Sequence, residues 1–412
     1  MWNYQKNILV CMIAGLGLST CTPSDVSIPG AATIDVMNGF PDGESGYALG
    51  VSGCYAGKLG DFLLMAGGCN FPDKPVSEGG IKHYYKGIYI ARVDDSSSLR
   101  WVKAGELPME AAYGATVSLP DRLIFIGGSN SSDRFSSVLS FSFDCMKDSG
   151  LICETLPPLP HAVDNMSATL LGDTLYVLGG NRNGIPSSSM FSLCLDNYSA
   201  GWTEVPFPGR PRVQPVCSSL LGKLYVFGGF TSGGDASVST DGLCYHPESG
   251  QWQVVKAPLT TKGEPLTLTG GASVSYGDVL LICAGGVNRD IFEDAISARY
   301  QMVRESEYLL QPIEWYRFND QLLAYNVRSG EWIRIGVPSP MLARAGSSLV
   351  VFGDILFYIG GELKPGVRTP GICVYLFKNN SGIEDVSLGP FILFCGSFFD
   401  GIFMFWMLDE FF

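Results

Sequence analysis

The sequence predicts an all-β fold, a six-bladed β-propeller with a short helical insertion in the fifth blade. The first observation is a repeat, in which an apolar run ends in a pair of glycines at intervals of about 50 to 75 residues. The pairs are Gly67-Gly68, Gly127-Gly128, Gly179-Gly180, Gly228-Gly229, Gly285-Gly286 and Gly360-Gly361. The second is a tryptophan beside a turn later in four of the units, at Trp101, Trp202, Trp252 and Trp332. The third is composition: 412 residues with 51 glycines and 46% hydrophobic residues suit many short strands joined by tight turns.

Each part of this repeat has a physical role. Units of about 50 residues with four short strands each are typical of kelch-type propellers. Glycine is required where a strand ends against a neighbouring backbone with no room for a Cβ atom. The tryptophan is expected to fill the space between adjacent sheets. Six units therefore predict six blades around one axis.

The chain divides into four segments. We expect a signal peptide at residues 1–20, a linker with a closing strand at 21–45, the propeller at 46–380, and a hydrophobic tail at 381–412. Lys6 precedes an apolar run at residues 8–18, and Leu18-Ser-Thr-Cys21 follows it, which resembles a bacterial lipobox apart from Thr20. We therefore expect an exported, periplasmic protein with lipid attachment at Cys21. The alternative is a single membrane helix, but the run is shorter than the roughly 20 residues that span a bilayer.

Two blades depart from the repeat. In blade five, residues 290–310 contain little Gly or Pro, and their apolar residues follow near-helical spacing, at Ile291, Ala295, Ala298, Met302 and Leu309. This pattern predicts a helix at the rim of the propeller, and the alternative is a solvated loop without a role.

Blade six has three clear strands, so a fourth strand must come from elsewhere to cover its open edge. Residues 32–36 are our candidate, and residues 384–388 are the alternative. The tail from residue 390 is almost entirely aromatic and aliphatic. It fits a short membrane helix, an aggregation-prone tail or a disrupted reading frame, and the sequence leaves these open.

Charge and composition exclude several partners. The net charge of −13 argues against nucleic acid or an anionic membrane surface, because both require a basic face. Lipid or the C-terminal tail would be the route to a membrane, and the oligomeric state stays open. The three histidines lie far apart, so we expect no metal site and no cofactor. The twelve cysteines are scattered singly and predict core filling rather than disulfides; those in predicted strands include Cys54, Cys145, Cys194, Cys217, Cys283 and Cys373.

The loops after the glycine pairs should form a pocket. Each pair ends the same strand of its blade, so the loops that follow emerge on one face around the axis. Their first residues are mostly polar: Asn70, Asn130, Asn181 with Arg182, Thr231, Asn288 with Arg289, and Glu362 with Arg368. A single Asn there can be an ordinary turn residue. We take Asn70, Asn181, Arg182, Asn288 and Arg289 as candidates for substrate binding.

One loop also carries a family motif. Gly361-Glu-Leu-Lys-Pro-Gly-Val-Arg-Thr369 resembles the Gly-Glu-Ala-Lys-Pro-Gly-Leu-Arg-Thr motif of the bacterial N-acetylneuraminate epimerases, the kelch sialic acid mutarotases. Ala66-Gly-Gly-Cys-Asn-Phe-Pro72 is similar to their Gly-Gly-Ala-Gly-Phe-Pro, with Ala112-Tyr-Gly114 downstream. The Phe-Pro block here precedes the Gly-Glu block, which is the order of the cyclically permuted mutarotase family. The resemblance covers about residues 47–377, and only the nine-residue motif is specific.

The resemblance implies an activity and two catalytic residues. Glu362 would be the proton acceptor and Arg368 an active-site partner, acting on N-acetylneuraminate without metal or cofactor. Anomerisation requires a base for the anomeric hydroxyl and an acid for the ring oxygen, and an arginine can bind the sugar carboxylate through two hydrogen bonds.

Other functions remain as alternatives. A sialidase would need Ser-x-Asp-x-Gly-x-Thr-Trp boxes, which the sequence lacks. A kelch copper oxidase would need histidine ligands. A non-catalytic propeller that binds glycans or proteins stays open, because a fold does not imply a function.

Overall fold

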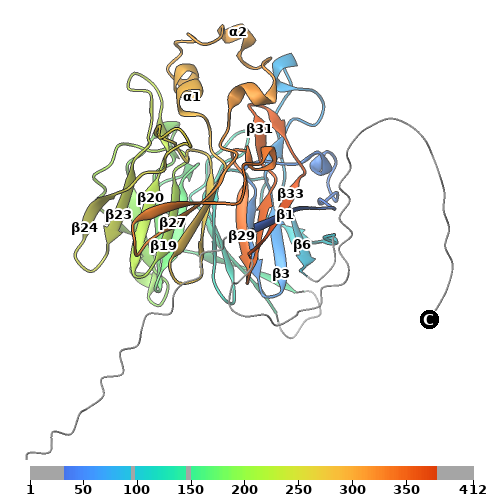
Figure 1. Cartoon of the computed structure of the whole chain (residues 1–412). Coiled ribbons are helices and arrows are strands. Elements are labelled where there is room, and N and C mark those ends of the chain that lie inside the picture. The colour runs from blue at the N-terminus through green and yellow to red at the C-terminus, as the bar shows by residue number, and fades with distance from the viewer. Residues whose placement is uncertain (1–31, 94–97, 145–149, 378–412) are drawn as a thin grey trace, which may run out of the picture.

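The computed structural model describes residues 32–93, 98–144 and 150–377 (Figure 1). The regular secondary structure of the described chain is almost entirely antiparallel sheet, which confirms the predicted all-β class. It contains six four-stranded sheets arranged in chain order. The predicted signal peptide, Cys21, Cys145 and the tail lie outside the described residues.

Each four-stranded sheet is one blade, and its strands are given from the axis outward. Blade one contains β2 Tyr55–Leu59, β3 Phe62–Ala66, β6 Gly87–Arg92 and β7 Trp101–Glu106. Blade two contains β8 Ala115–Ser118, β9 Leu123–Ile126, β10 Val138–Phe143 and β11 Leu151–Leu156. Blade three contains β13 Ser167–Leu171, β14 Thr174–Leu178, β17 Met190–Cys194 and β18 Thr203–Val205.

The remaining blades follow the same plan. Blade four contains β19 Val216–Leu220, β20 Lys223–Phe227, β23 Gly242–His246 and β24 Gln251–Val255. Blade five contains β25 Ala272–Tyr276, β26 Leu280–Ala284, β27 Leu322–Asn326 and β28 Glu331–Ile335. Blade six contains β29 Ser348–Phe352, β30 Ile355–Ile359, β33 Ile372–Phe377 and β1 Ala32–Met37.

Short strands form separate small sheets beside the blades. They are β4 Cys69–Asn70 with β5 His83–Tyr84; β12 Val163–Asp164 with β15 Asn181–Arg182 and β16 Ile185–Pro186; β21 Phe230–Thr231 with β22 Ser237–Val238; and β31 Glu362–Lys364 with β32 Val367–Arg368. In each small sheet, one strand begins directly after a glycine pair and the other strands pair with it. The small sheets therefore lie at the end of the propeller where the predicted pocket loops emerge.

A closed ring of backbone hydrogen bonds joins the six blades. One residue just before each innermost strand donates its N–H to the carbonyl of its counterpart in a neighbouring blade, over 2.7–3.1 Å. All six residues have left-handed backbone, with φ from 54° to 73°. In order they are Gly53, Tyr113, Asn165, Gln214, Gly270 and Gly346. The ring returns to Gly53 through Gly346, so the first and last blades are neighbours.

The glycine pairs act as the sequence predicts. The N–H of the second glycine donates to a carbonyl of the next blade in five of the six pairs, as Gly361 does to Val51 over 2.9 Å. A Cβ atom on Gly67 would lie 2.3 Å from the carbonyl oxygen of Ala111 in blade two. Any side chain there would force the two blades apart.

The tryptophans also link neighbouring blades. Each indole N–H donates to a carbonyl at the outer end of the preceding blade, as Trp252 does to Pro206 over 2.8 Å and Trp332 to Lys256 over 2.7 Å. The rings pack against the apolar clusters between blades. The predicted role of filling this space is confirmed, and the polar edge of the ring adds a hydrogen bond.

The strand from the N-terminal segment completes blade six. β1 pairs with the outer edge of β33 over six residue pairs, from Ala32 with Phe377 to Met37 with Ile372 (Figure 1). Residues 32–36 therefore occupy the place that we expected for them. This pairing gives partners to the backbone groups at the edge of β33.

The insertion in blade five is two short helices and a turn, not the single helix that the spacing predicts. α1 spans Arg289–Ile296, α2 spans Glu305–Tyr308, and a 3₁₀ turn spans Ile313–Tyr316. Left-handed backbone at Ala298 (φ 53°) and Tyr300 (φ 45°) breaks the helical path between them.

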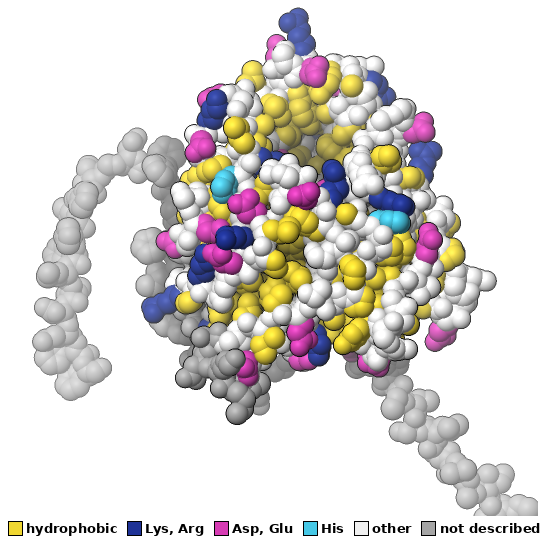
Figure 2. All heavy atoms as spheres, turned by 180° about the vertical axis from the view of Figure 1, so that it is seen from behind, with side chains coloured by type: hydrophobic (Ala, Val, Ile, Leu, Met, Phe, Trp, Pro, Cys, Tyr) yellow, Lys and Arg dark blue, Asp and Glu magenta, His cyan; other side chains and the backbone are white. Residues whose placement is uncertain are grey.

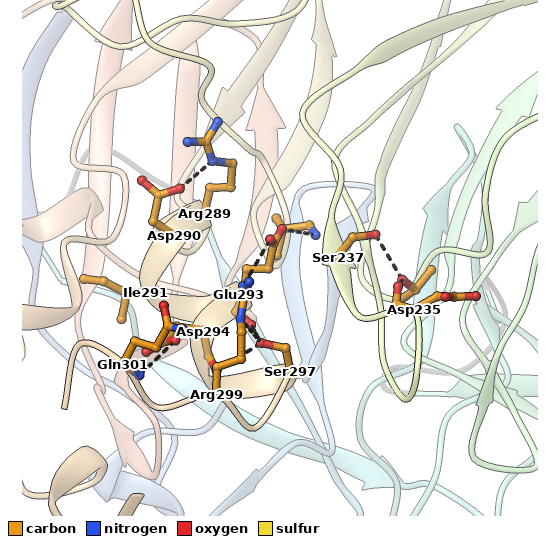
Figure 3. Close-up of polar contacts among 12 residues, drawn as sticks. Asp235, Ser237, Arg289, Asp290, Ile291, Glu293, Asp294, Ser297, Arg299 and Gln301 are labelled. Carbon is orange, nitrogen blue, oxygen red and sulfur yellow. Dashed lines mark hydrogen bonds and ion pairs between the residues drawn. The ribbon is translucent and has the colours of Figure 1, made fainter. Parts of the chain in front are cut away.

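The buried Asp294 carboxylate holds the break by accepting the N–H groups of Gln301 and Met302 over 3.1 and 3.0 Å (Figure 3). Glu293 ties the insertion to blade four by accepting the N–H of Val238 over 3.0 Å. Hydrogen bonds thus hold the insertion in its own conformation and also attach it to blade four.

Most described cysteines fill the core, as expected. Six free cysteines are buried, among them Cys54, Cys217, Cys283 and Cys373. The expectation is wrong for two exposed cysteines, Cys153 on the outermost strand of blade two and Cys194 at the last position of β17, because both places face solvent. Within the described ranges, no helix is long and apolar enough to cross a membrane.

Candidate active site

The motif of residues 361–369 folds into a tight hairpin that places its carboxylate against its guanidinium. Glu362 on β31 and Arg368 on β32 are direct cross-strand partners. The turn between them needs Gly366, which has φ 84° and whose N–H donates to Glu362 Oε1 over 2.7 Å. Glu362 Oε1 lies 3.1 Å from Arg368 Nη1. The sequence separation of six residues thus becomes a direct contact.

The repeat explains why this hairpin lies beside the axis. Glu362 exchanges two backbone hydrogen bonds with Ala345, the residue before Gly346 of the ring. The same relation holds in every blade. The residue that follows the glycine pair forms a backbone hydrogen bond with the residue that precedes one of the six residues in the ring. The six residues at this place are Cys69, Ser129, Asn181, Phe230, Val287 and Glu362. One of the six is a carboxylate, so Glu362 breaks an otherwise uncharged set.

Arg368 lies in a sheltered, mostly aromatic environment. Its side chain is 4% exposed, against 23% for Glu362. The guanidinium stacks over the ring of Phe71 at 5.2 Å, and Nη2 lies 3.5 Å from the hydroxyl of Tyr113. Burial is the largest influence and opposes the charge, but Glu362, Tyr113 and Cys69 together outweigh it, so the pKa of Arg368 is raised and the group stays positive.

Part of this guanidinium is left without a hydrogen bond. Nε and Nη1 of Arg368 form no hydrogen bond with any described residue, because the contact of Nη1 with Glu362 lacks the required alignment. Buried N–H groups without a partner are costly, so the surrounding structure must hold the guanidinium in this place.

A second cation lies on the same side. Lys82 Nζ is 3.1 Å from the Tyr113 hydroxyl and lies over three rings, those of Phe71, Tyr84 and Tyr113, at 5.1–5.9 Å. The positive side chains of Lys82 and Arg368 therefore lie together beside Tyr113, although the net charge of the chain is strongly negative.

The opposite wall of the pocket is apolar. Glu362, Tyr113, Gln214 and Gly346 line a pocket of about 190 Å³ with side chains from blade four and the insertion. Those apolar side chains are Phe230, Val287, Ile291, Phe292, Tyr308, Tyr316 and Phe318. Figure 1 places α1, α2 and β31 at the same end of the molecule, and Figure 2 shows hydrophobic side chains in the hollow beneath the insertion.

Lys364 connects the two walls. Its ammonium donates to the carbonyls of Leu309 and Gln311 in the insertion, the second over 2.6 Å. Burial and the charge of Glu362 raise the pKa of Tyr316 to about 12, so this phenol stays neutral beside the carboxylate. The pocket thus combines one charged edge with one apolar face, which suits a small polar acid that also has an apolar part.

The structure separates the predicted binding residues. Asn70 is buried, and its amide donates to the carbonyls of Gly46 and Gly50, so it supports the segment before blade one. Asn288 reaches the pocket, but its side chain accepts the N–H of Ile291 and caps α1. Arg289 pairs with Asp290 at 2.7 Å outside this pocket (Figure 3).

Asn181 and Arg182 lie on the hairpin of blade three, away from the pocket. Register explains the place of Asn70, because successive residues of a strand point to opposite faces, and Asn70 is second after its glycine pair whereas Glu362 is first. Asn181 is also first after its pair, but its hairpin belongs to blade three and does not line the pocket.

Three contributing residues were not singled out from the sequence: Phe71, Lys82 and Tyr113. Phe71 and Tyr113 lie in the two blocks that resemble the family, so the blocks carried a signal. Lys82 lies in the loop between β4 and β5, where nothing in the repeat marks it. Among the described residues, no group of His, Cys, Asp and Glu side chains could hold a metal ion.

Comparisons with known proteins identify the family of this chain. The family model for N-acetylneuraminate epimerase matches residues 156–401, which include the hairpin of Glu362 and Arg368. The N-acetylneuraminate epimerase of Haemophilus influenzae is 34% identical over 227 residues, 52% of this chain and 58% of that protein. Those of Yersinia pestis and Yersinia enterocolitica are 34% and 32% identical over 240 and 232 residues, 55% and 53% of this chain and 59% and 57% of those proteins.

These alignments span little more than half of each curated relative. The permuted order of the blocks stays a prediction, since the family match begins at residue 156, after the Phe-Pro block. The match covers more than half of the chain and contains its most specific motif, so the chain belongs to the N-acetylneuraminate epimerase family.

Proposed function

We propose that this protein interconverts the α and β anomers of N-acetylneuraminate by opening and closing the sugar ring. The observation that carries the proposal is the pairing of Glu362 with Arg368 at the edge of an axial pocket. The names of the relatives and the family match support the choice of sugar.

The carboxylate is arranged as a base. The Gly366 N–H and Arg368 both engage Oε1 of Glu362, and Oε2 has no hydrogen bond with a described residue. Oε2 is therefore the atom that can take the proton of the anomeric hydroxyl.

Arg368 binds the acid group of the substrate. The anomeric carbon of a sialic acid also carries a carboxylate, and the guanidinium of Arg368 beside Glu362 is a cation that would attract it. The apolar wall excludes water from the opposite face of the sugar. Binding and proton transfer need no metal or redox group in this scheme.

The test is a proton NMR time course of freshly released α-N-acetylneuraminate, with and without protein. A faster approach to the anomeric equilibrium supports the proposal. A rate equal to the spontaneous one would leave the non-catalytic, glycan-binding propeller as the better reading.

We also propose that the protein acts after export, in the periplasm and with Cys21 as a lipid attachment site. The support is the apolar run and lipobox-like tetrapeptide at the start of the sequence. Mass spectrometry of the N-terminal peptide would test the lipid attachment. The peptide should carry the added mass of a lipid, and treatment of the cells with globomycin, which inhibits lipoprotein processing, should change that mass.

A further inference from the structure

Tyr113 has an unusual backbone for its size. It is one of six residues in the ring of hydrogen bonds, and its φ is 62°. Left-handed backbone is unfavourable for a non-glycine residue, and three of the six ring positions are glycine. A bulky residue held in this conformation at the edge of a pocket points to a functional role.

Two cations reach the hydroxyl oxygen of Tyr113 as hydrogen-bond donors, Lys82 Nζ at 3.1 Å and Arg368 Nη2 at 3.5 Å. The Cys69 thiol lies at 3.0 Å from the same oxygen and its single proton is shared with the Ser52 carbonyl at 3.7 Å. A phenol oxygen also carries a proton of its own, and neither Lys nor Arg can accept it. Tyr113 lines the pocket together with Glu362, where a ligand oxygen can accept this proton.

One guanidinium places the phenol relative to the base. The two terminal nitrogens of Arg368 contact Glu362 on one side and Tyr113 on the other. These nitrogens share one carbon atom, so the carboxylate and the phenol flank the same group and open on the same pocket. The anomeric hydroxyl and the ring oxygen of a sugar are bonded to the same carbon, which requires a base and an acid placed in this way.

We infer that the Tyr113 phenol is the general acid that protonates the ring oxygen while Glu362 deprotonates the anomeric hydroxyl. The inference rests on the proposed anomerisation. The Glu362 carboxylate takes the hydroxyl proton, the C2–O bond of the ring breaks, and the phenol proton passes to the ring oxygen. This yields the open-chain keto acid, a protonated Glu362 and a tyrosinate. Closure on the other face of the carbonyl returns both protons.

The surroundings favour the protonated phenol before the reaction. The pKa of Tyr113 is raised well above its usual value, because burial disfavours the phenolate and the charges of Cys69 and Glu362 add to this, against Arg368. A raised pKa keeps the acid protonated across the neutral range, and the acid is lost only as the pH rises through that value. The titratable groups around the hydroxyl are Cys69, Lys82, Tyr84, Glu362 and Arg368.

Lys82 is a positioning residue in this scheme. Its ammonium donates to the phenol oxygen and would stabilise the tyrosinate once the proton has left. It orients the acid without contacting the substrate.

The experiment compares Tyr113→Phe with Tyr300→Phe in the full chain, by NMR of α-N-acetylneuraminate after subtraction of the spontaneous rate. Tyr300 is a matched control, since it is also a left-handed tyrosine (φ 45°) but does not line the pocket. We expect kcat of Tyr113→Phe to fall by about 10²-fold or more, with KM little changed, and Tyr300→Phe to match wild type. Wild-type kcat in Tyr113→Phe would overturn the inference and leave the proposed function standing. Inactivity of the wild-type protein would overturn both.

A second measurement does not depend on removing the hydroxyl. Replacing Tyr113 alone with 3-fluorotyrosine keeps the shape and the two cationic donors but lowers the pKa of the phenol. The alkaline limb of the kcat/KM profile should then move to lower pH. If the alkaline limb of the kcat/KM profile did not shift, the general acid would be a group other than Tyr113.

Discussion

At the residue scale, Glu362 differs from its five counterparts in the repeat by its charge. Its carboxylate is held through Oε1 by the Gly366 N–H and by Arg368, so replacing the charge need not disturb the hairpin. We expect Glu362→Gln to lower kcat by roughly 10²- to 10⁴-fold, because the amide keeps the shape and cannot take a proton. The same NMR time course measures it.

Glu305→Gln is the matched control, since Glu305 is exposed on α2. It should keep the wild-type rate. Full activity in Glu362→Gln would remove the general base from the proposed mechanism.

Arg368 owes its effect to shape as much as to charge. The planar guanidinium stacks on Phe71 and touches both Glu362 and Tyr113, which a lysine ammonium cannot do at once. We expect Arg368→Lys to raise KM for N-acetylneuraminate by about 10- to 100-fold, as expected for the loss of hydrogen bonds to a carboxylate. The measurement is the concentration dependence of the anomerisation rate.

The methyl ester of the same sugar provides the comparison for Arg368→Lys. It lacks the carboxylate charge, so the variant and the wild-type protein should differ little on it. Equal losses on acid and ester would argue against a contact with the carboxylate.

At the element scale, the β31–β32 hairpin sets the geometry of the pair. Gly366 has φ 84°, and a Cβ atom there would lie 2.0 Å from Val76 Cγ1. Gly184 in the β15–β16 hairpin has a similar φ of 81°, with nothing within 4 Å of the added atom. Substituting each glycine with alanine therefore distinguishes two effects: the backbone strain is similar at both positions, whereas the steric contact exists at Gly366 alone.

We expect Gly184→Ala to cost about 1 to 2 kcal/mol in the free energy of unfolding and to keep full activity. Gly366→Ala should cost more and should also reduce kcat, because the turn must move away from Val76 and carries Glu362 and Arg368 with it. Urea unfolding and the anomerisation assay measure both effects. Equal stability and activity in the two variants would show that the contact with Val76 is unimportant.

At the scale of the whole molecule, blades one and six meet where the ring of hydrogen bonds closes. β1 supplies the outer strand of blade six from the N-terminal segment, and its backbone pairs with β33 over six residue pairs. We expect deletion of residues 1–37 to lower the thermal midpoint by several degrees or to cause aggregation, because the edge of β33 becomes unpaired.

Deletion of residues 1–31 is the control for this truncation, because it leaves β1 in place. Its melting temperature, from differential scanning calorimetry, should equal that of the full chain. Equal midpoints for the two truncations would mean that β1 is dispensable for the propeller.

Much of the architecture is encoded locally. The glycine pairs, the strands before them and the tryptophans recur at regular positions, and each is required by a contact that repeats from blade to blade. Repetition of this kind can be recognised in a single sequence, because the same local constraint appears six times. The motif around Glu362 could be recognised for a similar reason, since a tight hairpin fixes both of its charged residues.

The tertiary structure decided what local pattern could not. The side chain of Asn70 turns into the fold and that of Glu362 into the pocket because they differ by one position after the glycine pair, and a strand alternates its faces. The ring brings Tyr113 of blade two to Arg368 of blade six, across 255 positions of the chain. No periodicity marks such a contact, because it depends on closure of the propeller. The sequence by itself determined the repeat, the all-β class and the charged pair, whereas the acid, the second cation and the apolar wall depend on how six blades meet around one axis.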